Sequence, residues 1–243
     1  MKRIFLLLII LICSSKLAYS QQFVTDGYVT MPYGTANLLF TAGERSSTVL
    51  PSLGLLHNWE FFLGASLINK DKDRGAEDHF ATILMAKWMF YENANKTGGA
   101  AITFGTGSNP AYYVKNRQIE SFRNYSAVGD FTLPLFNNLI SWDLNPGVLL
   151  DFNRNNDSNK ATWGFTYASR IAIYKIIPKT AIVGEIYGAM GEASSNPEYR
   201  FGLRFEGSSK VVPAITFGNS LNGSKGPGFE IGLMIFSSPF LFD

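Results

Sequence analysis

The chain is poor in cysteine and in charged residues, and each shortage excludes a class of function. Its single cysteine is Cys13. A mature chain that begins after this residue has no thiol, which excludes disulfides, thiolate nucleophiles and cysteine-ligated metals. Charged residues make up 16% of the chain, against about 25% in a soluble domain. The net charge of +2 and the lack of a Lys/Arg run argue against nucleic acid as a partner.

Histidine is also scarce, which limits the enzyme chemistry that the chain could support. The two histidines are His57 and His79. A lipid hydrolase needs a serine beside a histidine with an orienting acid or amide. His57 falls on a predicted inner turn, on the wrong side for external lipid, and no serine can be placed beside His79. Their separation does not match a metal-ligand spacing, and residues 153–157 lack the full calcium-loop pattern. We therefore expect no enzyme activity, no metal site and no cofactor.

The first 20 residues have the three parts of a secretory signal peptide. Lys2 and Arg3 supply the positive region, and residues 4–12 supply the apolar core. This core is shorter than the roughly 20 residues that a membrane-spanning helix needs. Small residues in Ala18-Tyr19-Ser20 fit the cleavage site, so we predict that the mature chain begins at Gln21.

Two alternatives to this cleavage are considered. The leader could stay attached as an anchor, or Cys13 could be a lipidation site, although the bulky Ile12 before it argues against lipidation. Residues 21–243 contain neither a Pro- or Ser-rich linker nor a repeat of solenoid period. The length therefore predicts one large all-β domain after the leader.

After the leader, the dominant pattern is an alternation of apolar with small or polar residues over segments of about ten residues. The clearest segments are 199–205 and 228–235. In a membrane barrel the apolar face meets lipid and the small or charged face lines the lumen. The predicted strands are residues 36–44, 48–56, 59–69, 79–90, 98–106, 120–132, 140–153, 162–173, 180–190, 198–206, 211–219 and 228–237.

This pattern predicts an all-β fold, a transmembrane antiparallel up-and-down barrel of about twelve strands. The first strand is the weakest, so a ten-stranded barrel with a structured N-terminal segment is the alternative. Three prolines fall within predicted strands, where bulges or shifted boundaries would accommodate them: Pro51, Pro146 and Pro213. Aromatic residues near predicted strand ends suggest interfacial belts: Trp59, Trp88, Phe90, Tyr91, Trp142 and Trp163.

The connections between predicted strands alternate in length. The tight ones are residues 57–58, 93–97, 134–138, 176–179 and 207–210. The long ones are residues 71–78, 106–119, 153–160, 191–197 and 219–227. Outer-membrane barrels have short periplasmic turns and longer external loops. We therefore expect a protein of the Gram-negative cell outer membrane, with outer-membrane lipid and the barrel-assembly machinery as partners. A secreted soluble β-sandwich is the alternative.

Charged residues on the predicted inner face suggest an ion-pair network in the lumen. Arg170 and Glu185 lie at nearly equal distances from the turn at residues 177–178, so they should meet across the hairpin. Arg200 and Arg204 would add positive charge there, and Glu230 would compensate it. The network predicts a polar constriction that orients a solute; the alternative is that paired charges only fill a narrow barrel. Weaker candidates for the same wall are Lys87, Asp130 and Asp143.

The second half of the sequence resembles a family of outer-membrane barrels of meta-pathway phenol degradation, grouped with hydrophobic-compound transporters. The matching motifs are residues 174–180 (YKIIPKT), 183–188 (VGEIYG), 198–204 (EYRFGLR) and 226–232 (GPGFEIG), with an echo at 54–60 (GLLHNWE). The resemblance implies passage of small molecules and names no substrate. Many such barrels end on an aromatic residue. Here Asp243 follows Phe242, and Phe236 is an alternative strand terminus.

These observations predict non-enzymatic passage or binding of a small solute, hydrophobic if the resemblance extends to the solute. Tyr112 and Tyr113 lie in the longest predicted loop, where they could contact a ligand, narrow the pore or sit exposed at the tip. The rival hypothesis is a structural outer-membrane barrel with a plugged lumen and loop-mediated binding.

A barrel in the outer membrane makes a direct prediction about the intact protein. Unheated protein should migrate differently from heated protein on a detergent gel, because a closed barrel stays folded until it is boiled. Fractionated cells should contain it with the outer membrane. Unheated protein in the periplasmic soluble fraction would exclude the barrel.

Overall fold

The computed structural model describes residues 23–69, 79–107, 113–114, 117–118, 124–152, 161–223 and 226–240. The leader with Cys13, and the terminal Phe242 and Asp243, lie outside these residues. No helix within the described part of the chain is long and apolar enough to cross a membrane.

The strands follow the predicted segments closely. Their bounds are β1 (Ala36–Gly43), β2 (Ser46–Leu56), β3 (Trp59–Ile68), β4 (His79–Glu92), β5 (Gly99–Gly107), β8 (Asn124–Leu135), β9 (Ile140–Leu144), β10 (Gly147–Asp151), β11 (Thr162–Ile177), β12 (Thr180–Gly191), β13 (Ser195–Phe205), β14 (Val211–Ser220) and β15 (Gly228–Phe236). A separate small hairpin consists of β6 (Tyr113–Val114) and β7 (Arg117–Gln118). The last strand ends at Phe236, the aromatic terminus that the sequence offered.

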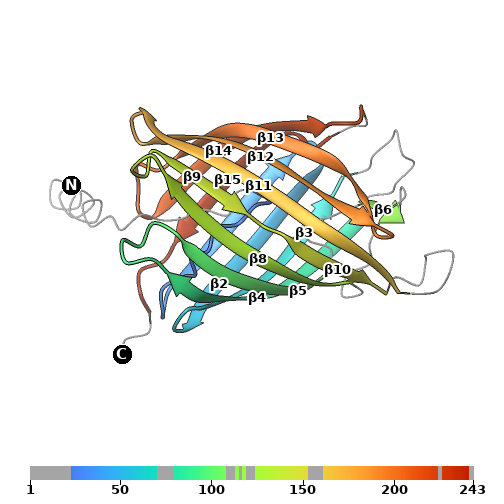
Figure 1. The fold of residues 1–243 in the computed structure, drawn as a ribbon, viewed down its shortest axis with the longest axis horizontal. Helices are drawn as coiled ribbons and strands as arrows, with labels where there is room; N and C mark the ends of the chain where they lie inside the picture. Colours follow the sequence, from blue (N-terminus) through green and yellow to red (C-terminus); the bar gives the residue numbers. More distant parts are fainter. Residues whose placement is uncertain are drawn as a thin grey trace, which may run out of the picture.

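The sheet closes on itself into a barrel whose strands run obliquely around one axis (Figure 1). Closure comes from β1, which pairs antiparallel with β15 from Asn37 opposite Phe236 to Gly43 opposite Glu230. Strands β9 and β10 together fill one place between β8 and β11. The described residues therefore form a ring of twelve antiparallel strands, which confirms the barrel and excludes both the sandwich and the ten-stranded alternative.

The break between β9 and β10 falls at Pro146, which has no N–H to give to the ladder. The neighbouring backbone continues the pairing around it. Asn145 exchanges both hydrogen bonds with Ala168, at 2.8 and 3.1 Å, and the Pro146 carbonyl accepts the Gly129 N–H at 2.9 Å. Pro51 and Pro213 instead lie in register within their strands.

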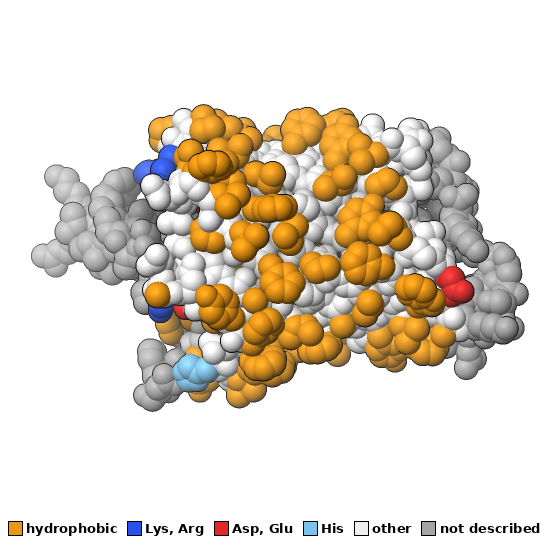
Figure 2. Space-filling view, in the orientation of Figure 1, with side chains coloured by type: hydrophobic (Ala, Val, Ile, Leu, Met, Phe, Trp, Pro, Cys, Tyr) orange, Lys and Arg blue, Asp and Glu red, His pale blue; other side chains and the backbone are white. Residues whose placement is uncertain are grey.

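The outer surface is apolar, because side chains alternate between the two faces of each strand. Along β14 every second residue is exposed and the intervening ones are buried. Ile215 and Phe217 point outward, while Thr216 between them points inward. Figure 2 shows apolar side chains across the middle of one face, with charged side chains at its two ends. Such a surface fits the hydrocarbon layer of a membrane.

Exposed aromatic side chains gather at one end of β3 and β4. Trp59 stacks on Trp88 with ring centroids 5.9 Å apart, and Trp88 contacts Phe90 at 5.8 Å. Trp88, Phe90 and Tyr91 are all exposed. Their position at the strand ends matches the interfacial belt expected from the sequence.

One end of the barrel carries short turns, and the other carries most of the long connections, as predicted. We call them the short-turn end and the long-loop end. The prediction was wrong for residues 191–197, because only 192–194 connect β12 to β13. Gly191 has a φ of 103°, which turns the chain quickly, and Ser195 already pairs with Ala189. The first hairpin at the same end is also tight, with residues 44–45 between β1 and β2.

The outward direction of the apolar residues can be tested at Leu63, in the middle of β3, which is 60% exposed. We expect Leu63→Arg to destabilise the barrel in lipid vesicles by about 2–4 kcal/mol, because the charge would lie in hydrocarbon. Denaturant unfolding in vesicles measures this loss, and Leu63→Ile is the control. Equal stability of the Arg and Ile variants would show that this face does not meet lipid.

Candidate functional site

The lumen holds a segment of the chain that the sequence analysis did not place there. Residues 23–35, here called the lumen segment, precede β1; residues 23–31 lie inside the barrel, and the exposed Pro32 marks where the segment reaches the barrel end. The side chains of Thr25 and Tyr28 are completely buried, and Phe23 is buried as well. Because β1 starts at the short-turn end, the lumen segment joins the barrel wall at that end.

Carboxylates on the barrel wall hold the backbone of the lumen segment. Glu185 on β12 accepts hydrogen bonds from the N–H groups of Val24 and Thr25, at 3.2 and 3.0 Å. Glu60 on β3 accepts the N–H of Met31 at 3.2 Å. β3 and β12 are opposite each other in the ring, six strands apart in either direction. The lumen segment therefore bridges opposite walls, and charged side chains satisfy backbone donors that have no strand partner.

A buried lysine fastens the middle of the lumen segment. The side chain of Lys87 is fully buried, and its Nζ donates to Asp26 Oδ2 at 2.7 Å and to the Gly27 carbonyl. The Asp26 N–H donates to Asn145 Oδ1 at 3.0 Å, and Asn145 Nδ2 donates to Asp130 Oδ1 at 2.6 Å. A buried charge must be paired to be tolerated, and Asp26 supplies the partner of Lys87. The weaker sequence candidates Lys87 and Asp130 thus do face the lumen.

Tyr28 fills the lumen beside β5. Its N–H donates to Thr132 Oγ1 at 3.2 Å, and its hydroxyl donates to Glu92 Oε1 at 3.3 Å. Gly99 on β5 makes room for the ring, because a Cβ there would lie 2.4 Å from Tyr28 Cδ2. The ring is therefore held by its contact with Gly99 on one side and by the hydroxyl hydrogen bond to Glu92, while the backbone N–H is held by Thr132.

The predicted pair of Arg170 and Glu185 needs correction. The two residues are direct register partners across the β11–β12 hairpin, as predicted. However, Arg170 makes its ion pair with Asp143, at 2.8 Å, while Glu185 binds the lumen segment and lies 4.0 Å from Arg200. The prediction considered only one neighbour of β11. The other neighbour, β9, places Asp143 opposite Arg170 as well.

The remaining predicted charges divide into two groups. Arg200 and Glu230 form an ion pair at 3.2 Å, so this part of the network is brought together. Arg204 lies farther toward the short-turn end, where it pairs with Glu206 and donates to the Tyr174 hydroxyl at 3.2 Å. The five predicted residues all lie in the lumen wall, but they do not form one cluster.

Sequence reasoning missed the ion pair between Arg45 and Glu198. Arg45 Nη1 and Nη2 donate to the two carboxylate oxygens of Glu198 at 2.8 and 2.7 Å. The Tyr187 hydroxyl donates to the same carboxylate at 2.9 Å. Arg45 follows β1 and Glu198 lies on β13, which are not neighbouring strands. No local pattern could therefore have paired them.

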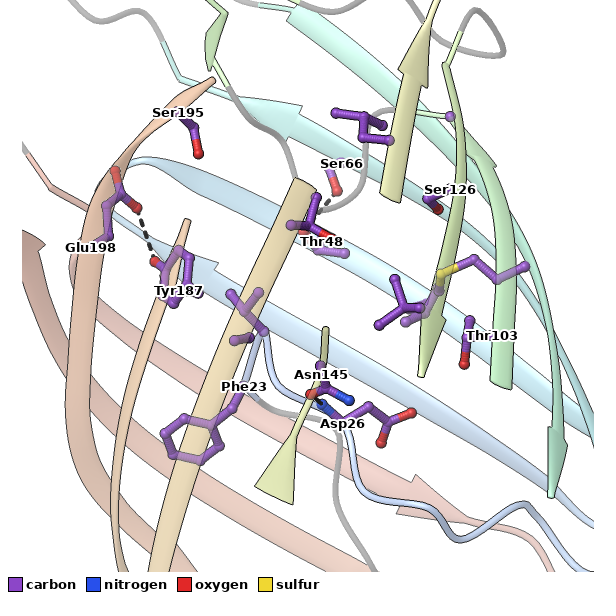
Figure 3. A pocket seen from close by; sticks show the side chains of 18 of the residues that line it. Phe23, Asp26, Thr48, Ser66, Thr103, Ser126, Asn145, Tyr187, Ser195 and Glu198 are labelled. Atoms are coloured by element: carbon purple, nitrogen blue, oxygen red, sulfur yellow. Dashed lines mark hydrogen bonds between the residues drawn. The ribbon is translucent and has the colours of Figure 1, made fainter. Parts of the chain in front are cut away.

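A cavity of about 230 Å³ occupies the long-loop half of the lumen (Figure 3). The lumen segment supplies one side of it through Phe23, Val24 and Asp26. The ion pairs of Arg45 with Glu198 and of Arg200 with Glu230 also line it. The lumen is thus divided into a filled part that contains the lumen segment and a hollow part toward the long loops.

The other residues that the sequence singled out are the two loop tyrosines and the two histidines. Tyr112 lies outside the described residues, and Tyr113 belongs to β6, although its side chain is not described. His79 begins β4, while His57 stacks on Tyr33 with ring centroids 4.9 Å apart. Among the described residues, no three His, Cys, Asp or Glu side chains gather in a way that would hold a metal ion.

The closed ring, apolar outer surface and polar lumen define a β-barrel of the outer-membrane type. The sequence matches no family model and none of the curated proteins with which it was compared. The fold, by contrast, is similar to several solved outer-membrane structures.

Two of these similar structures are of the KdgM porin, one of them in complex with disordered oligogalacturonate. The TM-scores are 0.55 and 0.56 at 11% identity, over 84% of this chain and 98% of the porin. An outer-membrane channel from Pseudomonas putida F1 has a TM-score of 0.54 at 11% identity, over 86% of this chain and 97% of the channel. The NanC porin has a TM-score of 0.51 at 10% identity, over 85% of this chain and 99% of the porin. These TM-scores show a shared fold, and at identities of 10–11% they show the fold alone.

The corrected partner of Arg170 can be tested by a double-mutant cycle. Arg170→Ala leaves the buried Asp143 unpaired, so we expect a loss of about 3–5 kcal/mol in the free energy of unfolding. Adding Asp143→Ala should recover part of the lost stability, because no unpaired acid then remains. Adding Glu185→Ala should not, because the N–H groups of Val24 and Thr25 then lose their acceptor. Denaturant unfolding of the wild type, the single variants Arg170→Ala, Asp143→Ala and Glu185→Ala, and the two double variants measures both couplings. Recovery of stability in Arg170→Ala/Glu185→Ala, but not in Arg170→Ala/Asp143→Ala, would contradict the pairing of Arg170 with Asp143.

Proposed function

We propose that the protein is a non-enzymatic outer-membrane barrel that takes a small solute into the cavity at the long-loop end. The solute would cross the membrane passively when the lumen segment moves aside. The single observation that carries this proposal is the bridge that the lumen segment makes between Glu60 and Glu185 on opposite walls. This bridge lies between the cavity and the short-turn end, where the proposed route continues.

The fastening of the lumen segment suits a movable part better than a permanent core. Its backbone is held by side-chain hydrogen bonds at separate points and not by a strand ladder, so each contact can exchange for water singly. The C-terminal end of the lumen segment is attached to the wall by a backbone hydrogen bond, in which the Gly34 N–H donates to the Gly54 carbonyl at 2.7 Å. The attached end would serve as the hinge.

The orientation and partners follow from the same proposal. Short turns would face the periplasm and long loops the exterior, as in known outer-membrane barrels. A cleaved leader would export the chain, and the barrel-assembly machinery would insert it into the lipid.

A relationship to the meta-pathway phenol-degradation family also stays a proposal. The buried apolar side chains of the lumen wall, Leu39, Leu50 and Phe62, would suit a hydrophobic part of a solute.

A reversible tether tests whether the lumen segment controls passage. A Cβ on Gly27 would lie 3.4 Å from Thr132 Oγ1, which suits a disulfide between Gly27→Cys and Thr132→Cys. In planar bilayers, we expect the oxidised double variant to stay in its lowest conductance state. Reduction should restore the openings of the wild-type protein, and the two single-cysteine variants are the controls.

Removal of residues 23–33 provides the complementary measurement. We expect this variant to conduct continuously, because nothing then spans the lumen between Glu60 and Glu185.

Equal conductance of the oxidised and reduced forms of the Gly27→Cys/Thr132→Cys variant would contradict the role of the lumen segment. A deletion variant that folds but does not conduct would favour a structural barrel with a plugged lumen.

A further inference from the structure

We propose that the cavity binds an uncharged, polyhydroxylated solute with a single ring, such as a neutral monosaccharide or a cyclitol. The inference rests on the proposed function and names the class of solute. The cavity volume of about 230 Å³ is smaller than the roughly 300–1,000 Å³ of sites for drug-sized ligands. A molecule of one ring is therefore the appropriate size.

The charges around the cavity disfavour an anionic solute. The charged residues of its lining are Asp26, Asp130, Glu198, Glu230, Arg45 and Arg200. Both arginines are engaged by carboxylates: Arg45 by Glu198 with two hydrogen bonds, and Arg200 by Glu230. An acidic sugar would have to displace a carboxylate from one of these pairs, and it would then face an excess of acidic groups.

The same pairing disfavours a cation. Asp26 is bound by the ammonium group of Lys87, and Asp130 accepts hydrogen bonds from Thr103 and Asn145. Each acid in the lining is thus already satisfied by the protein. A neutral solute leaves all of these contacts intact, so the electrostatics of the cavity select for the absence of charge.

Hydroxyl and amide groups surround the cavity on many strands. They come from β1, β2, β3, β5, β8, β11 and β13 and from the link between β9 and β10. Figure 3 shows six of them: Thr48, Ser66, Thr103, Ser126, Asn145 and Ser195. A ring with a single hydroxyl could use only one side of such a wall. A ring with hydroxyls around its edge matches donors and acceptors on all sides.

Two of the cavity hydroxyls have no partner among the described residues. Thr166 is 6% exposed, and its Oγ1 makes no hydrogen bond; Ser195 Oγ is also buried without one. A buried hydroxyl without a partner is costly, and both residues line the cavity. A solute bound in the cavity would supply the missing partner of each hydroxyl. Leu39, Leu50 and Phe62 line another part and would contact the C–H face of the ring.

The test is a ligand-observed NMR titration of the mature protein in detergent micelles, with empty micelles as the blank. The neutral probes are D-glucose, D-galactose and myo-inositol, and the anionic counterparts are D-glucuronate and D-galacturonate. Tetrahydropyran-2-methanol carries the sugar ring with one hydroxyl. We expect at least one neutral polyol to bind, and each acid and the one-hydroxyl ring to bind at least tenfold more weakly.

Matched variants connect the binding to the cavity. Thr166→Val keeps the shape and removes the free hydroxyl, so the Kd of the neutral probe should rise about fivefold. Thr216→Val is the control, because Thr216 is equally buried in the wall with an unpartnered Oγ1 but does not line the cavity. Its Kd should not change.

Three results would overturn the inference: no binding of any neutral polyol, equal or tighter binding of an acid, or equal or tighter binding of the one-hydroxyl ring. Equal Kd values for the Thr166 and Thr216 variants would also place the site elsewhere. These outcomes are separate from the conductance of the tethered barrel, so the proposed gating by the lumen segment can hold while the solute class fails.

Discussion

Closure of the strand ring is the constraint on which the rest of the structure depends. Inside a membrane every backbone N–H and C=O of a strand must find a partner within the protein, and the pairing of β1 with β15 removes the last free edge. The ring then fixes the direction of each side chain. Apolar residues such as Ile215 are exposed on the outer surface, while charged residues such as Arg170 enter a narrow lumen where they must be paired.

The lumen segment is the second consequence of that geometry. A ring of this size leaves a space that side chains from the wall alone do not fill evenly. Residues 23–35 occupy part of it and supply partners for Glu185 and Lys87, two of the buried charges. The remaining cavity is lined by polar groups and by charged groups that are already paired. The lumen segment thus fills part of the lumen, pairs buried charges and sets the boundary of the cavity.

The strands were predictable, because an apolar outer face and a polar lumen impose a strict period of two, as in β14. The ion-pair partners of the charged residues in the lumen were harder to predict. Arg170 has neighbours on both β9 and β12, and only the first was missed. The lumen segment has no period at all, and the acceptor of the Thr25 N–H is Glu185, 160 residues away. Such contacts depend on closure of the whole ring and leave no local pattern.

Amide hydrogen exchange of the lumen segment, in the mature protein reconstituted in lipid nanodiscs, tests the central claim most directly. We expect slow exchange at Val24, Thr25 and Met31, because carboxylates of opposite walls hold their N–H groups. Substituting Glu185 by Gln should speed exchange at the first two and spare the third. Exchange of all three at the rate of an unstructured peptide would contradict a segment held inside the barrel.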